Sequence, residues 1–171
     1  MAHSGGIDHW PVEEIPDPDR LFYRVHVNSL AQGQLVPGAL REQRNPEAPQ
    51  ERGSMSTEWE KYASPEEALS RSSDSKKNGI VSLVVGEVRK IPGLVARHDP
   101  NTPRPPLRSH AGIEGISAPV GAAGESPYAG LAAKKRKTMI REKLLKVCEW
   151  VIEPPGDPSS ERAGVGDSSP P

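Results

Sequence analysis

Residues 79–100 read GIVSLVVGEVRKIPGLVARHDP and form the only sizeable apolar block of the chain. Residues 80–85 are rich in valine and flanked by glycines, which is typical of a buried strand. Residues 87–91 predict one helical turn that a Pro-Gly pair closes, and residues 94–98 predict the next strand. A helical alternative for this block stays open, because four valines also fall at helical spacing: Val81, Val84, Val85 and Val88.

The composition limits how much of the 171-residue chain can form a packed core. The chain has 16 glycines, 19 prolines and one phenylalanine, and 34% of its residues are hydrophobic. Globular domains are roughly 45–50% apolar when glycine is counted. We therefore expect one modest core, because polar, Pro-rich segments bury too little apolar surface to offset the entropy lost on ordering. The formal net charge of −1 gives no overall field that would attract nucleic acid or an anionic membrane.

Residues 21–27 predict the first strand, because aromatic and β-branched residues follow a Pro-Asp turn signal. Side chains alternate between the two faces of a strand, so the segment divides into two sets. The set expected to meet the core is Leu21, Tyr23, Val25 and Val27. The opposite set is Phe22, Arg24 and His26, which places a cation beside an imidazole.

Two helices are predicted on opposite sides of the central block. A capping box marks the start of the first, over residues 65–71, with Ser64 as the cap, Pro65 in the first turn and Glu67 completing the box. The second covers residues 131–150, and its apolar stripe consists of Ile140, Leu144, Val147, Cys148 and Val151. Val151 and Ile152 also fit a terminal strand. Further strands are predicted within residues 54–60 and 107–116.

These elements predict a single small α+β domain over residues 21–152. Its sheet is expected to be mixed or antiparallel, with about four to six strands, and the two helices pack on it. Residues 1–20 are interpreted as an extended lead-in and residues 153–171 as a disordered tail. Inside the domain, two loops and one flexible insert are expected: 41–53, 99–106 and 117–130.

Several short blocks, taken in order, resemble a group of small bacterial proteins to which no activity is assigned. The blocks are Arg-x-His at 24–26, Ser-Met-Ser-x-x-Trp at 54–59, Ser-Pro-Glu-Glu at 64–67, Val-Gly-Glu-Val-Arg at 85–89 and Ser-His-Ala at 109–111. The similarity covers residues 8–116 and 139–152. The resemblance implies one domain and carries no particular chemistry with it.

The first candidate site combines Arg24, His26, Ser56, Thr57 and His110. The guanidinium fork of arginine suits carboxylate or phosphate, and histidine carries a proton near neutral pH. If the strands pair closely, Arg24, Ser56 and Thr57 would bind an anionic or nucleotide-like small molecule, while His26 and His110 would act as catalytic proton carriers. In the competing interpretation, Arg24 pairs with a structural acid and His26 is an ordinary outer-face residue.

A metal site is the second candidate. Its ligands would come from three histidines, His26, His98 and His110, with either Asp99 or Glu114 as the carboxylate. None of the spacings matches a close ligand pair such as His-x-x-x-His, so neither a metal nor a cofactor is predicted. The single cysteine, Cys148, lies on the apolar stripe of a predicted helix and is interpreted as a core residue rather than a nucleophile.

A second function class rests on the basic residues of segment 134–146. The run Lys134-Lys135-Arg136-Lys137 continues with Arg141, Lys143 and Lys146. Such a segment can neutralise the phosphates of nucleic acid or bind an acidic protein, and it is also common on ordinary solvated helices. It lacks the interleaved aromatic residues that stack on single strands.

No membrane partner is expected, and a cytoplasmic location is predicted. The N-terminus has no basic segment followed by an apolar one, so it does not resemble a secretory signal. No apolar run approaches the roughly 18 residues of a membrane span. A single cysteine fits a reducing compartment. An enzyme or binding protein for a small anion and an interaction module are both open at this point.

Overall fold

The computed structural model describes residues 9–46, 51–103, 105–118, 120 and 127–156. Its elements follow one another in this order: β1 (Arg20–His26), η1 (Val27–Ser29), β2 (Leu30–Ala31), β3 (Gln34–Leu35), η2 (Pro37–Ala39), β4 (Ser54–Trp59), α1 (Pro65–Ser70), η3 (Ser75–Lys77), β5 (Asn78–Val84), α2 (Val85–Arg89), β6 (Val95–His98), β7 (His110–Glu114), α3 (Ala133–Lys146) and β8 (Cys148–Ile152). The labels η mark short 3-10 helices.

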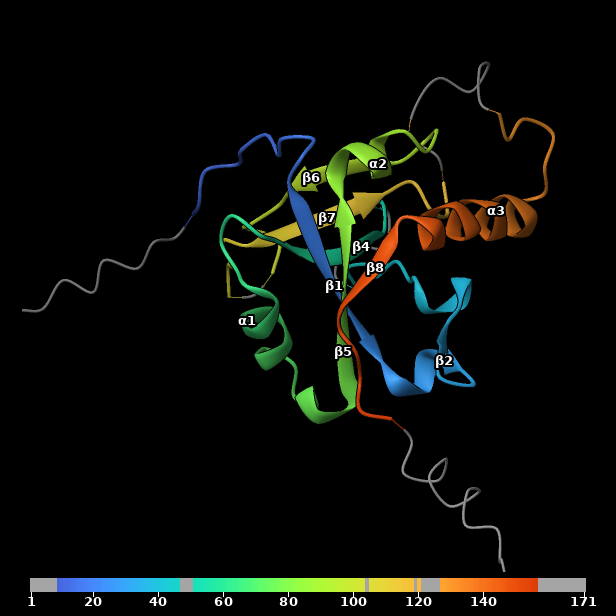
Figure 1. Ribbon diagram of the computed structural model, residues 1–171. Coiled ribbons are helices and arrows are strands. Elements are labelled where there is room, and N and C mark those ends of the chain that lie inside the picture. The colour runs from blue at the N-terminus through green and yellow to red at the C-terminus, as the bar shows by residue number, and fades with distance from the viewer. Residues whose placement is uncertain (1–8, 47–50, 104, 119, 121–126, 157–171) are drawn as a thin grey trace, which may run out of the picture.

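Six strands form one antiparallel sheet in the order β6-β7-β4-β1-β5-β8, and β2 pairs with β3 in a separate hairpin (Figure 1). The pairing of β1 with β5 is the longest, and it runs from Arg20 opposite Val84 to His26 opposite Asn78. The predicted α+β class is therefore confirmed, with an antiparallel sheet at the upper end of the expected size. The valine-rich segment is a strand, as preferred, although Val85 already belongs to α2.

The main core lies between α3 and the face of the sheet predicted to be apolar. Leu21 and Val25 of β1 belong to the same buried cluster as Ile140 and Leu144 of α3, and each is 1% exposed or less. Burying such a side chain contributes about 1.5–3 kcal/mol relative to leaving it exposed. This packing fixes which way every alternating residue of the sheet points.

The opposite face is covered by α1 over β1 and β5. Ala68 of α1 packs against Phe22 of β1 and Ile80 of β5 in a second, small buried cluster. The predicted capping box is present: Ser64 Oγ accepts from the Glu67 N–H at 3.2 Å, and Glu67 Oε2 accepts from the Ser64 N–H at 2.7 Å. A local signal in the sequence thus sets where the chain turns back over this face.

The C-terminal helix is shorter than predicted, and this part of the prediction is wrong. Instead of extending over residues 131–150, α3 ends at Lys146, and β8 follows along β5. Residues of β8 alternate between partly buried and exposed, and their pairing with β5 satisfies backbone groups that an open edge would leave free. Cys148 therefore lies in a strand.

The lead-in contacts the domain where it is described. Ile15 is fully buried. The backbone N–H of Trp10 donates to Asn101 Oδ1 at 2.8 Å, and Asn101 Nδ2 donates to the Trp10 carbonyl at 2.9 Å. The predictions for residues 1–8, 121–126 and 157–171 lie outside the described residues.

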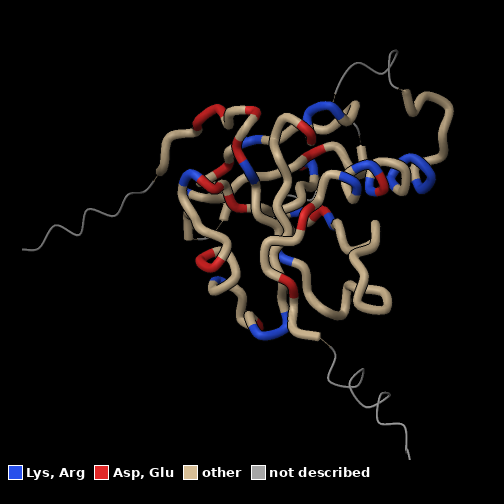
Figure 2. The backbone as a smooth tube through the Cα atoms, in the orientation of Figure 1, with Lys and Arg blue, Asp and Glu red and all other residues tan. Residues whose placement is uncertain are grey.

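Charge is unevenly distributed over the surface of the domain. Lysines and arginines recur along α3 (Figure 2). Within the described part of the chain, no helix has the length and apolarity needed to cross a membrane.

Candidate functional site

The register of the sheet decides which predicted site residues share a face. Phe22 lies opposite Glu58, and Glu58 lies opposite His110. Because side chains alternate, Arg24 and Ser56 point to the same side as Glu58 and His110. We call this side the polar face. It is the side on which α1 lies, and α1 packs on β1 and β5.

Ser56 and His110 form a hydrogen-bonded pair on the polar face. Ser56 Oγ lies 3.0 Å from His110 Nε2, and His110 Nδ1 lies 2.7 Å from the Asp99 carbonyl oxygen. A carbonyl oxygen only accepts, so Nδ1 carries a proton and donates to it. In the neutral imidazole Nε2 is then the acceptor, and the Ser56 hydroxyl donates to it. His110 is 8% exposed, and Ser56 is half-buried.

Arg24 lies on the same face of the sheet as this pair and makes weak contacts of its own. Its Nη1 donates to the Ala68 carbonyl oxygen at 3.4 Å, near the limit for a hydrogen bond. Among the described residues, no acidic side chain forms an ion pair with Arg24. The competing prediction, in which Arg24 pairs with a structural acid, is therefore not confirmed by the described residues.

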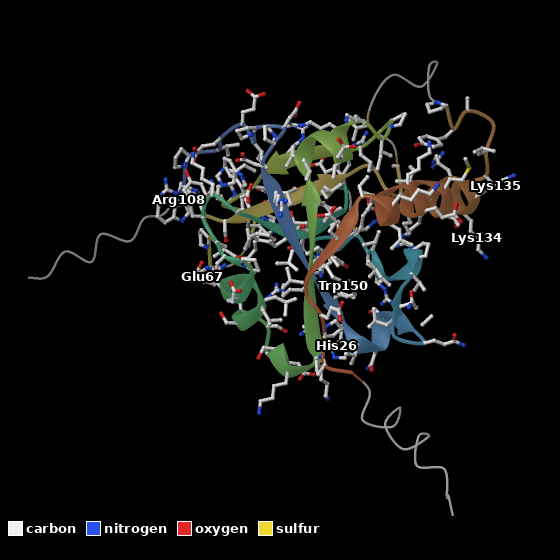
Figure 3. The ribbon with its side chains drawn as sticks, in the orientation of Figure 1. His26, Glu67, Arg108, Lys134, Lys135 and Trp150 are labelled. Atoms are coloured by element: carbon white, nitrogen blue, oxygen red, sulfur yellow. The ribbon has the colours of Figure 1, made fainter. Side chains whose placement is uncertain are left out.

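His26 and Thr57 are placed away from the Ser56–His110 pair. His26 ends β1 at the far end of the strand (Figure 3), where Nδ1 accepts from the Asn28 N–H at 3.1 Å and Nε2 lies 3.4 Å from Asp74 Oδ2. Thr57 points to the core face, is 2% exposed and donates through Oγ1 to the Ala111 carbonyl oxygen at 3.0 Å. The structure brings Ser56 and His110 together and places Arg24 on the same face of the sheet.

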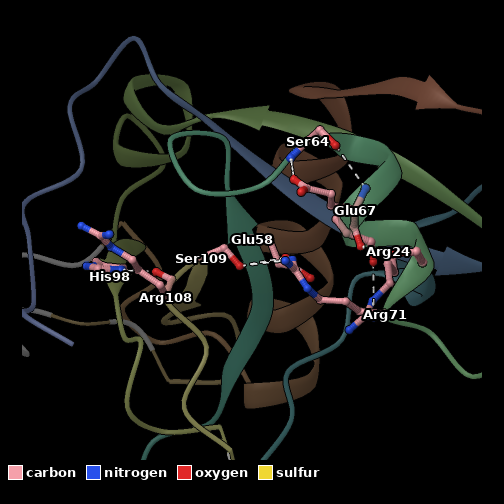
Figure 4. A network of polar contacts seen from close by, with 10 residues as sticks. Arg24, Glu58, Ser64, Glu67, Arg71, His98, Arg108 and Ser109 are labelled. Carbon is pink, nitrogen blue, oxygen red and sulfur yellow. Dashed lines mark hydrogen bonds and ion pairs between the residues drawn. The ribbon is translucent and has the colours of Figure 1, made fainter. Parts of the chain in front are cut away.

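A buried carboxylate that the sequence analysis did not select completes the polar face. Glu58 Oε2 accepts from Arg71 Nη1 and, at 2.9 Å, from Ser109 Oγ (Figure 4). The Glu58 side chain is 7% exposed, and its Oε1 has no hydrogen-bond partner in the described structure. Strand alternation in residues 54–60 was a usable signal, because Glu58 follows Ser56 by two positions. Arg71 carried no such signal, since only the packing of α1 brings it here.

The predicted metal ligands do not gather. His98 points to the core face, where its Nδ1 accepts from the Glu13 N–H at 3.0 Å and its Nε2 donates to the Arg108 carbonyl oxygen at 2.7 Å. Its ring packs against Trp59, with centroids 5.1 Å apart. Among the described residues, no group of three or more histidines, cysteines or carboxylates is arranged to hold a metal ion.

The thiol of Cys148 is not placed to act as a nucleophile. Burial raises the pKa of its thiol to about 12, so the thiolate is scarce at neutral pH. This agrees with its interpretation as a core residue, although it lies in β8 rather than on a helix.

A groove of about 940 Å³ lies between the β2–β3 hairpin and the end of β8. Leu30 and Leu35 form part of its wall on one side, and Trp150 and Pro154 on the other. None of the predicted site residues lines this groove.

Comparison of the chain with protein-family models, curated protein sequences and solved structures gave no match. The function is therefore argued from the geometry of the described residues.

Proposed function

We propose that the protein binds a small anionic molecule on its polar face and exchanges a proton with it through His110. The observation that carries this proposal is the Ser56–His110 pair. Its imidazole is held by a backbone carbonyl in the tautomer whose Nε2 accepts the hydrogen bond of the Ser56 hydroxyl and can take up its proton. A base oriented by a third group is the usual arrangement for activating a hydroxyl.

Arg24 supplies the charge for the anion in this proposal. Its fork makes one long hydrogen bond in the described structure, so most of its donors are available to a carboxylate or phosphate. Ser56 orients the bound molecule through its hydroxyl. The proton of that hydroxyl, or of a ligand hydroxyl in its place, passes to His110 Nε2.

Part of the site predicted from the sequence is not used here. His26 is engaged by Asp74, and Thr57 lies on the core face, so neither supports the binding of the same molecule. Glu58 lies next to the site, and the Arg71 guanidinium offsets its negative charge. This offset favours an anion over a cation as the ligand.

The test is a thermal-shift screen of small carboxylates, phosphates and nucleotides against the native protein and Arg24→Gln. A ligand at 100 times its Kd stabilises the folded state by about 2.7 kcal/mol. That corresponds to a rise in Tm of roughly 5–10 °C for a chain of this size. The matched control is Arg20→Gln, because Arg20 is an exposed arginine on the same strand.

The proposal expects at least one anionic compound that raises the Tm of the native protein and of Arg20→Gln but not the Tm of Arg24→Gln. For such a compound, His110→Gln and Ser56→Ala should retain binding and lose any pH-dependent turnover. The proposal is refuted if no anion in the panel raises the Tm of the native protein. A ligand whose shift persists in Arg24→Gln refutes it as well.

A further inference from the structure

The 14-residue helix α3 is the most basic element of the described structure. It carries seven lysines and arginines and a single acidic residue, Glu142, which gives it a net charge of +6. The whole chain has a formal net charge of −1. Over the described residues, none of the seven cations of α3 takes part in a salt bridge. The helix therefore presents uncompensated positive charge.

The orientation of α3 leaves much of this charge in contact with solvent. Ile140 and Leu144 anchor one side of the helix in the core and are fully buried. Lys134 and Lys135 are exposed and extend away from the sheet (Figure 3), as is Lys146 near the last turn. Because the anchor uses one side of the helix, the opposite side is available to a partner without any change in the fold.

Arginines from other segments extend the basic surface. Arg136 Nη2 donates to the Ser117 carbonyl oxygen at 3.2 Å, and Arg52 Nη1 donates to the next carbonyl, that of Ala118, at 3.0 Å. Two guanidinium groups, one from α3 and one from the segment before β4, thus meet at neighbouring peptide groups. Burial lowers the pKa of Arg141, and the positive charge of the nearby Arg41 lowers it further.

Two of these arginines have donors that the protein does not use. Arg136 Nε and Arg141 Nε are buried and lack a hydrogen-bond partner in the described structure. The charge of Glu42 acts on Arg141, and the Glu42 carboxylate accepts from the Ser117 N–H at 3.1 Å. One carboxylate does not compensate four arginines. Backbone carbonyl oxygens hold Arg136, Arg52 and Arg41 by one hydrogen bond each. The remaining Nη donors of these forks are available to an external oxyanion.

We propose that α3, together with Arg41 and Arg52, is a docking surface for the phosphate backbone of a nucleic-acid duplex. A helix of 14 residues is about 21 Å long, so its seven cations are spaced at about one per 3 Å. Each strand of a duplex carries one phosphate charge per about 3.4 Å of the duplex axis. The exposed cations of this surface can contact several such phosphates, and they are Lys134, Lys135, Lys146, Arg41 and Arg52.

The composition of α3 favours a duplex over the other polyanions. The helix contains no aromatic residue, so it offers nothing on which unpaired bases could stack. The large hydrophobic residues that are exposed within the described residues are Val12 and Val151. Neither belongs to α3, so the helix lacks the apolar anchors typical of protein interfaces and of membrane-surface helices.

The experiment measures anisotropy of a labelled 20-bp DNA duplex, a 20-bp RNA duplex and the matching single strands between 50 and 200 mM salt. With five to seven phosphate contacts, the slope of log K against log salt should be about −4.5 to −6. A slope near −5 corresponds to about a thousandfold loss of affinity over this range. The double variant Lys134→Gln/Lys135→Gln should reduce the slope by about 2, since each contact contributes about 0.9.

The matched control is Lys76→Gln/Lys77→Gln, an adjacent pair of exposed lysines in η3, which should leave the slope unchanged. Arg52→Gln serves as a second variant on an exposed residue outside the helix and should lower the slope by about 1. Circular dichroism confirms that each variant is folded.

Four results would overturn the proposal. The first is an absence of duplex binding at 50 mM salt. The second is binding of single strands as tightly as duplexes. The third is equal competition by poly-glutamate, which would indicate an acidic protein partner. The fourth is binding to vesicles with 30% phosphatidylserine in place of duplex. None of these outcomes bears on the Arg24 site, so the two proposals stand or fall separately.

Discussion

Replacement of Arg71 by alanine tests whether the polar face depends on a buried ion pair. Glu58 is 7% exposed as a side chain, and it accepts from Arg71 and Ser109. Without Arg71 the carboxylate keeps one neutral donor and stays buried. Removing one partner of a buried pair costs about 3–5 kcal/mol. Because the Arg71 side chain is 34% exposed, water can enter the vacated space, and we expect a loss of about 2–3 kcal/mol, or roughly 5–10 °C in Tm.

The assay is urea denaturation of Arg71→Ala, Glu58→Gln and the double variant. Arg71→Ala leaves the buried Glu58 charge without its partner, and Glu58→Gln removes that charge. The loss of unfolding free energy in the double variant should therefore be smaller than the sum of the two single losses, by about 1–2 kcal/mol. Arg97→Ala is the matched control, because Arg97 is exposed and lies 3.8 Å from Glu114, and its loss should be under about 1 kcal/mol. A cost for Arg71→Ala no larger than that of the control, or strictly additive losses, would refute the reasoning.

Three further predictions concern the rest of the fold. Ser64→Ala removes the α1 cap and should cost about 1 kcal/mol in urea denaturation; no measurable loss would show that α1 is held by packing alone. Cys148, whose pKa is raised to about 12 from 9.0, should react with a thiol reagent at pH 8 about a thousandfold more slowly in the folded than in the unfolded protein. The folded state keeps this proton longer, so Cys148 should make unfolding easier by about 1.4 kcal/mol per pH unit as the pH rises from about 9 toward 12, measured as the difference from Cys148→Ala; parallel stability profiles of the two proteins would contradict the burial of the thiol. Gly115→Ala places a Cβ 2.0 Å from the Gly93 carbonyl oxygen at φ +104° and should lower the free energy of unfolding by more than about 2 kcal/mol. Gly33→Ala is the control, because Gly33 has φ +74° but lies in open space, and it should cost about 1 kcal/mol.

Features specified by a few neighbouring residues could be predicted from the sequence. The capping box at Ser64 needs only the side chains of one helical turn, and it is present as predicted. The valines of β5 and the alternation in β1 likewise reflect local preferences for an extended chain. The two faces of β1 are assigned correctly, because burial of Leu21 and Val25 decides the orientation of the whole strand.

The end of α3 depends on a distant segment and could not be predicted from the same kind of signal. The apolar residues around Cys148 fit a helical stripe as well as a strand. The choice is made by β5, which pairs through Val81 with Trp150 and through Leu83 with Cys148. Hydrogen bonds to an existing strand outweigh the helical preference of a few residues.

The candidate site shows the same division between local and distant information. Alternation places Ser56 and Thr57 on opposite faces, but the sequence does not say which face His110 shares. That follows from the register between β4 and β7, in which Glu58 lies opposite His110. Arg71 joins the polar face only because α1 crosses the sheet in one particular direction.

The unequal cover of the sheet explains why the polar face can hold a site. On the core side, α3 and its neighbours require large apolar side chains, and those positions are filled by residues such as Leu21 and Trp59. On the other side α1 spans six residues and packs on β1 and β5. On β4 and β7 the positions of that side include Ser54, Ser56 and Gly112, and a Cβ at Gly112 would lie 3.0 Å from the Ser54 side chain. The hydrogen-bonded Ser56–His110 pair lies among these small and polar residues, on the side of the sheet where α1 leaves β4 and β7 to other cover.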